Sequence, residues 1–294
     1  MEFDVIAELV RGVPNMTPEQ GRRVYDHVRT TRPSEILELG TSYGVSAAYM
    51  AAALDANGEG QITTVDHVRS NPPEDLLQRI EPAVIRRISL VRIEDSSYNW
   101  WLKKQIRARS DAAGNCEPVY DFCYLDGAHN WTVDGFAVVL IQKLLRPGAY
   151  LLLDDLNWVY RSDPHGMRER GVFFPLSPAE RTEPHIRDVF ELIVKPHPAF
   201  NDFRVEDEGW AWARKCATDP RRLSVQISRS LSTVLKALLM RTTQHIDVSL
   251  TLQRERLRKA RGDQRLIQQE IEERAQELAR LRWIEEGSRE GTDQ

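Results

Sequence analysis

Three aspartates and one histidine, in two short motifs, are the residues of this sequence best suited to chemistry. The motif DGAH begins at Asp126 and ends at His129, and the pair Asp154-Asp155 follows the next apolar run. Oxygen donors with no cysteine or second histidine beside them favour Mg²⁺. An ion held by Asp126, Asp154 and Asp155 would bind a hydroxyl group and lower its pKa. His129 would then accept the hydroxyl proton as a general base.

Simpler roles for these residues stay open. Asp126 would instead cap a helix that begins near Trp131, and Asp154 would be a solvated strand end. His129 would be a structural histidine that only makes hydrogen bonds. Trp131 and Trp158 would either wall a substrate site or pack in the core. The elements around these side chains decide between the two sets of roles.

A second candidate site is the segment ELGTSYGVS. Its glycines, Gly40 and Gly44, allow the backbone to turn tightly and approach a ligand, and the helix expected after them offers unpaired N–H groups. Glu38 lies at the end of a buried run and needs a donor there, such as the cationic amino group of a ligand. Asp66 ends the next run and is placed to accept hydrogen bonds from ribose hydroxyls. Asp95 follows the third run, where an adenine amino group would lie.

Alternating apolar runs and helical segments must position these motifs. Short apolar runs separated by helical patterns indicate βαβ units and a doubly wound, mostly parallel sheet. Such a sheet binds its ligands at the carboxyl ends of the strands, which is where the candidate residues fall. A late antiparallel strand is expected at 203–215, after a long covering segment at 156–200. The expected strands are 35–40, 61–66, 88–95, 120–126 and 149–155, with helices at 17–31, 45–54, 74–87 and 136–145 and a turn at 146–148.

Composition and charge exclude several classes of protein. The chain of 294 residues has a net charge of -4, which divides into -8 on residues 1–220 and +4 on residues 221–294. An acidic body is a poor partner for nucleic acid. No apolar run approaches the length of a membrane span, and the acidic N-terminus does not resemble a signal peptide. Three cysteines without a CxxC pair fit reduced thiols, so a cytoplasmic location is expected.

The motifs carry a family resemblance. ELGTSYGVS, TTVD, IEDSS, YDFCYLDGAH, LLRPGAYLLLDD and GWAWARK, in this order, resemble the class I S-adenosylmethionine-dependent methyltransferases over residues 15–215. The ExGxxxGxS form, with MTPEQG upstream, is similar to the catechol and caffeoyl-CoA O-methyltransferase branch. The resemblance implies a cofactor site in which Glu38, Gly40 and Gly44 hold the methionine part, Asp66 the ribose, and Asp95 with Ser96 the adenine edge. The other residues implied in that site are Thr41, Ser42, Ser46 and Asp126.

The DGAH motif and the acid pair resemble one branch in particular. Metal-dependent macrolide-sugar O-methyltransferases of this fold carry a DGxH and a following acid pair, with the acids on the metal and the histidine as base. The resemblance implies these roles for Asp126, Asp154, Asp155 and His129. Catechol-type enzymes have a lysine at the position of His129 and an Asp-Asn pair on the metal. Leu156 stands at the position of that asparagine, which favours the sugar-type arrangement.

We therefore expect two parts with different roles. Residues 1–220 form the methyltransferase domain, which transfers a methyl group from S-adenosylmethionine to a hydroxyl of a sugar or natural-product intermediate, with Mg²⁺ and with His129 as base. Residues 221–294 form a helical extension with a weak heptad pattern, expected to make a homo-oligomer.

Three alternatives remain beside this prediction. One is a metal-independent methyltransferase of the same fold, and another is a nonmethylating binding or scaffold protein. A nicotinamide-dependent dehydrogenase is disfavoured, because Ser42 stands at the second glycine of the GxGxxG fingerprint.

Overall fold

The computed structural model describes residues 1–162, 176–207, 209–217 and 268–277. The chain divides into two compact units, Met1–Ser224 and Val225–Gln294. In the second unit the described residues, 268–277, are helical and exposed. Most of the predicted extension at 221–294 lies outside the described residues. Among the helices that the structure describes, none has the length and apolar character needed to cross a membrane.

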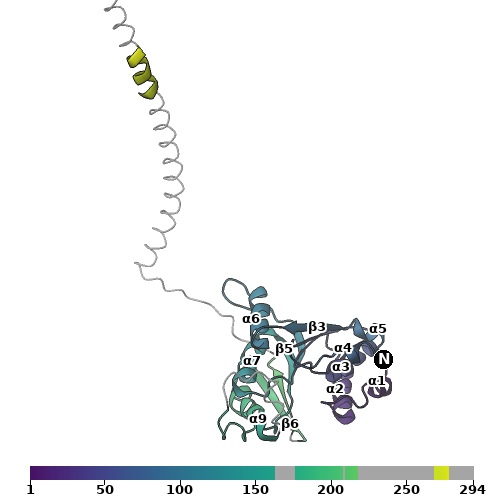
Figure 1. Ribbon diagram of the computed structural model, residues 1–294. Coiled ribbons are helices and arrows are strands. Elements are labelled where there is room, and N and C mark those ends of the chain that lie inside the picture. Colours follow the sequence, from purple (N-terminus) through teal and green to yellow (C-terminus); the bar gives the residue numbers. More distant parts are fainter. Residues whose placement is uncertain (163–175, 208, 218–267, 278–294) are drawn as a thin grey trace, which may run out of the picture. The chain divides into compact units, whose positions relative to one another are not determined.

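A seven-stranded sheet with the order β3-β2-β1-β4-β5-β7-β6 forms the centre of the first unit (Figure 1). The first five strands are parallel, and β7 runs antiparallel to both β5 and β6. This architecture confirms the doubly wound, mostly parallel sheet predicted from the apolar runs. The strands are β1 (Glu35–Leu39), β2 (Gln61–His67), β3 (Ile88–Ile93), β4 (Tyr120–Leu125), β5 (Leu145–Leu153), β6 (Phe200–Glu206) and β7 (Trp210–Lys215).

Helices cover both faces of the sheet and enclose a separate apolar core on each (Figure 1). The Ala-rich helix α3 is buried almost all round, which explains why its pattern lacks a polar face. On the first face lie α1 (Phe3–Leu9), α2 (Pro18–Thr31), α3 (Val45–Asn57), α4 (Glu74–Leu77) and α5 (Pro82–Ile85). On the second lie α6 (Tyr98–Ala108), α7 (Trp131–Leu144), α9 (His185–Asp188) and η2 (Val189–Val194), and η1 (Tyr160–Ser162) follows β5.

Reciprocal hydrogen bonds close the first turn of α2. The Thr17 hydroxyl accepts a hydrogen bond from the Gln20 amide at 3.2 Å, and the Gln20 side chain accepts one from the Thr17 amide at 2.9 Å. With Pro18 in the first turn, this is a complete capping box.

Several predicted boundaries were wrong, each for a local reason. The single strand expected at 203–215 is a hairpin of β6 and β7, because the chain turns at Asp207 with a φ of 47°. The turn expected at 146–148 lies inside β5, where the pairing with β4 shifts register and tolerates a proline. The helix expected at 74–87 is the two short helices α4 and α5.

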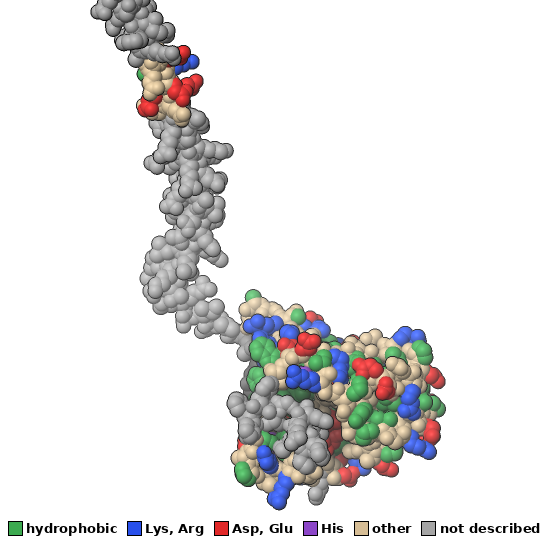
Figure 2. All heavy atoms as spheres, viewed as in Figure 1, with side chains coloured by type: hydrophobic (Ala, Val, Ile, Leu, Met, Phe, Trp, Pro, Cys, Tyr) green, Lys and Arg blue, Asp and Glu red, His purple; other side chains and the backbone are tan. Residues whose placement is uncertain are grey.

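The surface of the described residues carries charges of both signs. On the face drawn in Figure 2, the Lys and Arg side chains are interspersed with Asp and Glu rather than gathered in one patch. Many of these side chains form exposed ion pairs such as Arg32 with Glu59 at 2.6 Å. Exposed pairs of this kind contribute little to stability.

Gly40 lets the loop after β1 touch the loop after β4. Its φ is +104°, and a Cβ atom there would lie 1.8 Å from the Asp126 carbonyl oxygen. The Asp126 amide in turn donates to the Leu39 carbonyl at 2.9 Å. Only glycine permits this approach, which brings the two candidate sites of the sequence together.

A comparison of two glycines tests this constraint. Gly58 also has a positive φ, +79°, but an added Cβ would meet no atom within 4 Å. We expect Gly58→Ala to lower the free energy of unfolding by about 1–2 kcal/mol, from the backbone conformation alone. Gly40→Ala should cost at least twice as much, because the backbone itself must move. Urea denaturation measures both, and equal losses would contradict the close approach.

Candidate active site

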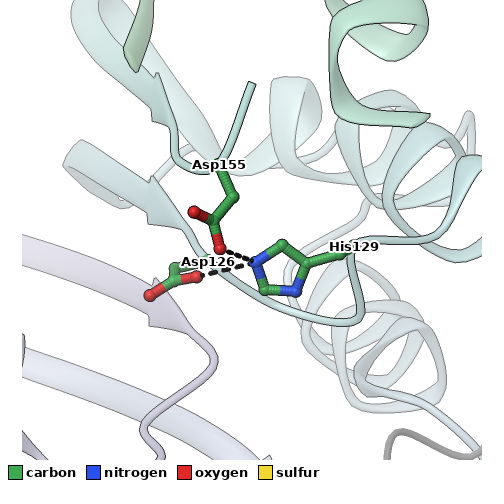
Figure 3. A group of neighbouring side chains, drawn as sticks. All are labelled: Asp126, His129 and Asp155. Carbon is green, nitrogen blue, oxygen red and sulfur yellow. Dashed lines mark ion pairs between the residues drawn. The ribbon is translucent and has the colours of Figure 1, made fainter. Parts of the chain in front are cut away.

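Asp126, His129 and Asp155 converge at the carboxyl ends of β4 and β5 (Figure 3). The imidazole Nε2 of His129 lies 3.2 Å from Asp126 Oδ1 and 2.5 Å from Asp155 Oδ2. The two strands are adjacent and parallel, so the loops that follow them leave the same edge of the sheet. One ligand atom from each residue lies within 4.8 Å of the others. This is the arrangement that the DGAH motif and the acid pair predicted for three of their four residues.

Two of these residues have an unusual backbone. His129 has a φ of 52° and Asp155 a φ of 56°, both in the left-handed region. Such conformations cost non-glycine residues about 1–2 kcal/mol and are held only where the surroundings fix them. The side chains of both residues point into the cluster from these positions (Figure 3).

Asp154 lies beside the cluster and has a set of partners of its own. Its Oδ1 accepts hydrogen bonds from Trp210 Nε1 at 2.7 Å and from the Asp155 amide at 2.6 Å. Its Oδ2 accepts one from the Tyr124 hydroxyl. Only 6% of Asp154 is exposed, so its interpretation as a solvated strand end is wrong. A carboxylate has about four acceptor positions, so Oδ2 keeps one for a cation.

The charges in this cluster do not balance. Burial disfavours the imidazolium, but the hydrogen bonds with Asp126 and Asp155 raise the pKa of His129 to about 10. Burial and then the Asp155 carboxylate raise the pKa of Asp154 to about 6. Burial and the Asp154 carboxylate also raise the pKa of Asp126. His129 brings one positive charge to three closely spaced acids, and the raised pKa values show that the ionised forms of Asp126 and Asp154 are disfavoured there. A divalent cation would compensate these charges.

The donor atoms present fit Mg²⁺ on the carboxylates. Asp126 and Asp155 offer hard oxygens from two adjacent loops, as Mg²⁺ requires. The imidazole nitrogen of His129 suits softer metals better, so His129 is a poorer ligand for Mg²⁺ than its neighbours. The ring of Trp158 lies 5.1 Å from that of His129, while Trp131 is exposed at the start of α7.

The alternative role of Asp126 as a helix cap was wrong. The cap of α7 is Asn130, whose side-chain oxygen accepts hydrogen bonds from the amides of Thr132 at 3.0 Å and Val133 at 3.2 Å. Asp126 is therefore available to the cluster. The helix begins at Trp131, the start that the capping alternative expected, and so extends five residues before the predicted run at 136–145.

Three predicted cofactor residues form a buried network beneath the glycine loop. Glu38 is fully buried and accepts hydrogen bonds from the hydroxyls of Ser46 and Thr64. Thr41 and Thr64 share a further hydrogen bond at 2.5 Å. The network ties the loop after β1 to β2 and to the start of α3. Gly44 ends this loop at a φ of +82° and directly precedes α3.

Asp66 links the loops that follow β1 and β2. Its Oδ2 accepts a hydrogen bond from the Ser42 amide at 2.8 Å, and its Oδ1 accepts one from the Ser70 hydroxyl at 2.5 Å. The Ser42 hydroxyl in turn accepts from the side-chain amides of Asn15 at 2.6 Å and Asn71 at 3.0 Å. Neither asparagine belongs to a motif predicted for the cofactor site, so sequence reasoning did not find them.

The residues predicted at the adenine edge follow β3. Asp95 forms an ion pair with Lys104 of α6 at 2.7 Å. It lines a surface recess together with Ile93 and Trp101. Ser96 is the next residue along the chain and precedes α6.

Comparison with known proteins identifies similar chains and domains. A family model described as "Methyltransferase domain" matches residues 37–156, which run from β1 through the Asp154-Asp155 pair. This match includes the glycine loop and the DGAH motif on which the predicted resemblance to methyltransferases rests.

The named relatives share low sequence identity with this chain. A rhamnosyl O-methyltransferase of Mycobacterium tuberculosis is 28% identical over 128 residues, which are 43% of this chain and 47% of the relative. The chain thus matches about half the length of the curated relatives. The structure of the O-methyltransferase TomG from Streptomyces achromogenes aligns with a TM-score of 0.47 and 18% identity, covering 73% of this chain and 89% of that one. An O-methyltransferase from Bacillus cereus gives 0.45 and 20%, covering 72% and 87%.

Glu38 should make stability depend on pH. Burial outweighs the hydrogen bonds from Ser46 and Thr64 and raises the pKa of Glu38 to about 7, from 4.5. The folded state therefore binds this proton more tightly than the unfolded state, and its contribution to stability declines as pH rises from about 4.5 to 7. Glu38→Gln keeps an acceptor but removes the titration. We expect the variant to gain stability relative to the native protein between pH 5 and pH 8.

Urea denaturation at several pH values measures this difference. The matched control is Glu74→Gln, which changes an exposed carboxyl on α4. A difference between native protein and Glu38→Gln that stays constant from pH 5 to pH 8 would refute the buried titration.

Proposed function

We propose that this chain transfers the methyl group of S-adenosylmethionine to a hydroxyl of a small molecule. The observation that carries the proposal is the convergence of Asp126, His129 and Asp155 next to the glycine loop. A methyltransferase domain spans both sites. A methyl donor that is already activated as a sulfonium needs only a positioned and deprotonated acceptor. The acid–histidine cluster supplies groups suited to that task.

We propose a sugar hydroxyl as the acceptor. The curated relative is named a rhamnosyl O-methyltransferase, and its match includes 43% of this chain. The sequence motif DGAH with a following acid pair resembles the sugar-modifying branch as well. Self-association through residues 221–294 and a cytoplasmic location stay predictions.

Asp126 and Asp155 would hold Mg²⁺, with Asp154 as the third predicted ligand through its remaining acceptor position on Oδ2. When bound there, the ion supplies Lewis acidity that lowers the pKa of the substrate hydroxyl. Asp154 is oriented by Tyr124 and Trp210, which fixes the carboxylate from the far side. Buried partners of this kind hold a ligand in one orientation.

His129 would take the hydroxyl proton at Nε2. In the ion pair with Asp126 and Asp155 its pKa is about 10, so the imidazole holds a proton at neutral pH. To accept a proton, His129 needs those carboxylates to be engaged by another cation. The proton-accepting role of His129 would thus depend on a cation at the carboxylates. The side chain of His129 is only 5% exposed, and the Trp158 ring beside it limits the access of water.

Removal of the base tests its role. We expect His129→Ala to bind S-adenosylmethionine as the native protein does, because the glycine loop is unchanged. Its kcat should fall by roughly 10²–10⁴-fold, the usual scale for a lost general base. Calorimetry measures cofactor binding, and single-turnover assays with rhamnosyl acceptors measure the methyl transfer. His197→Ala, in the turn before β6, is the control. Undiminished turnover in His129→Ala would reject the assignment.

Removal of the metal separates the proposal from a metal-independent methyltransferase. EDTA should abolish turnover, and added Mg²⁺ should restore it. Calorimetric titration of the protein with Mg²⁺ should show binding that Asp126→Asn and Asp155→Asn weaken by at least tenfold. Asp26→Asn, which changes an exposed acid on α2, should leave that binding unchanged. Full activity in EDTA would instead support the metal-independent alternative.

A further inference from the structure

The loop that carries His129 is fastened at three backbone atoms by side chains from other elements. The hydroxyl of Tyr98, on α6, accepts a hydrogen bond from the Ala128 amide at 3.3 Å. The hydroxyl of Tyr160, on η1, donates to the Ala128 carbonyl at 2.9 Å. The Asp134 carboxylate, on α7, accepts from the Asn130 amide at 2.6 Å. Each of the three side chains is at least nine-tenths buried.

These contacts form one connected set. The Tyr98 hydroxyl donates its proton to Asp134 Oδ1, which leaves an oxygen lone pair for the Ala128 amide. The second oxygen of Asp134 takes the Asn130 amide. Gly127 makes room for this arrangement, since a Cβ there would lie 2.4 Å from the Tyr98 hydroxyl. Loss of any member therefore leaves a buried polar group of another without its partner.

Two of the three held atoms, the Ala128 carbonyl and the Asn130 amide, belong to the peptide groups on either side of His129. The third, the Ala128 amide, belongs to the peptide group before these two. Rotation about the backbone bonds of His129 moves one flanking peptide group relative to the other. The Ala128 carbonyl belongs to the first group and the Asn130 amide to the second. When both are held, His129 keeps its φ of 52°, which a histidine does not adopt by preference. From this position Nε2 reaches both Asp126 and Asp155.

We propose that Tyr98, Asp134 and Tyr160 are positioning residues that hold the backbone of His129 in the left-handed conformation, so that its Nε2 faces the acid pair. Their effect on turnover rests on the proposed function of His129. Their effect on the loop does not, and it is measured without substrate. A merely structural role would instead change global stability and leave the loop and the catalytic rate alone.

Tyr160→Phe is the sharpest variant, because it removes one oxygen and keeps the ring. Its matched control is Tyr25→Phe on α2. The Tyr25 hydroxyl also donates to a backbone carbonyl at 2.9 Å, that of Met1, and Tyr25 is 3% exposed against 1% for Tyr160. The two variants thus lose equivalent bonds, one at the His129 loop and one far from it in the sequence and on another helix.

Hydrogen exchange of the Ala128 and Asn130 amides reads the loop directly. We expect Tyr160→Phe to speed exchange at both amides at least tenfold, while Tyr25→Phe leaves them unchanged. We also expect kcat to fall by roughly 10–100-fold in Tyr160→Phe, with the KM for S-adenosylmethionine unchanged, because misplacement of a catalytic group costs rate rather than cofactor binding. Equal melting temperatures for the two variants together with equal exchange and equal kcat would overturn the proposal.

Asp134 provides a second, graded test. Asp134→Asn keeps an oxygen for the Asn130 amide but removes the acceptor of the Tyr98 proton, so exchange and kcat should change less than in Asp134→Leu. Asp134→Leu loses both contacts and should resemble or exceed Tyr160→Phe. Identical behaviour of the Asn and Leu variants would contradict the fastening. If exchange responds as expected but His129→Ala keeps full turnover, the three side chains do hold the loop and His129 is not the general base.

Discussion

The close approach of three carboxylates at two adjacent strand ends is the constraint on which the site depends. Burial raises the pKa of Asp126 and Asp154, and the neighbouring carboxylates raise both further. Like charges in such surroundings repel unless positive charge or hydrogen bonds compensate them. His129 supplies the charge, and Tyr124 and Trp210 supply hydrogen bonds. The remaining features of the site serve to bring these groups together.

The backbone accommodates this constraint at a few special positions. Gly40 allows the first loop to lie against the Asp126 carbonyl, and two left-handed residues turn their side chains inward. A fully buried Glu38 network holds the base of the first loop from below. The result is a cofactor loop and an acid–histidine cluster that share one edge of the sheet. Neither loop could reach this position alone, because each packs against the other.

The sequence predicted the site best where acidic residues or histidine directly follow an apolar run. Apolar runs located the parallel strands, and the residues after them located Asp126, His129 and Asp155, since strand ends of a parallel sheet meet at one edge. The partners of Asp154 were not predictable in this way. Trp210 belongs to a strand 56 residues further along the chain, and its approach depends on the order β5-β7 in the sheet.

Other parts of the site are set by packing rather than by motif. The left-handed backbone of His129 has no signature in a histidine, and the roles of Tyr98 and Asp134 depend on how α6 meets α7. The sequence predicts one strand across β6 and β7 because apolar and charged residues alternate from Phe203 to Glu206 and an apolar run follows at 210–213. The local sequence pattern therefore predicts the helices and strands, whereas long-range contacts determine the partners of the acid–histidine cluster.

The donor from β7 has a consequence for the order in which this protein is made. During synthesis, β1 to β5 and the acid pair leave the ribosome before Trp210 exists. Until the chain has grown to the end of β7 and the strand has inserted beside β5, the Asp154 carboxylate lacks its indole partner. A nascent chain that already contains the entire matched domain, residues 37–156, is therefore still an unfinished site. The hydrogen-bond partners of Asp154 are therefore complete only after β7 has paired with β5.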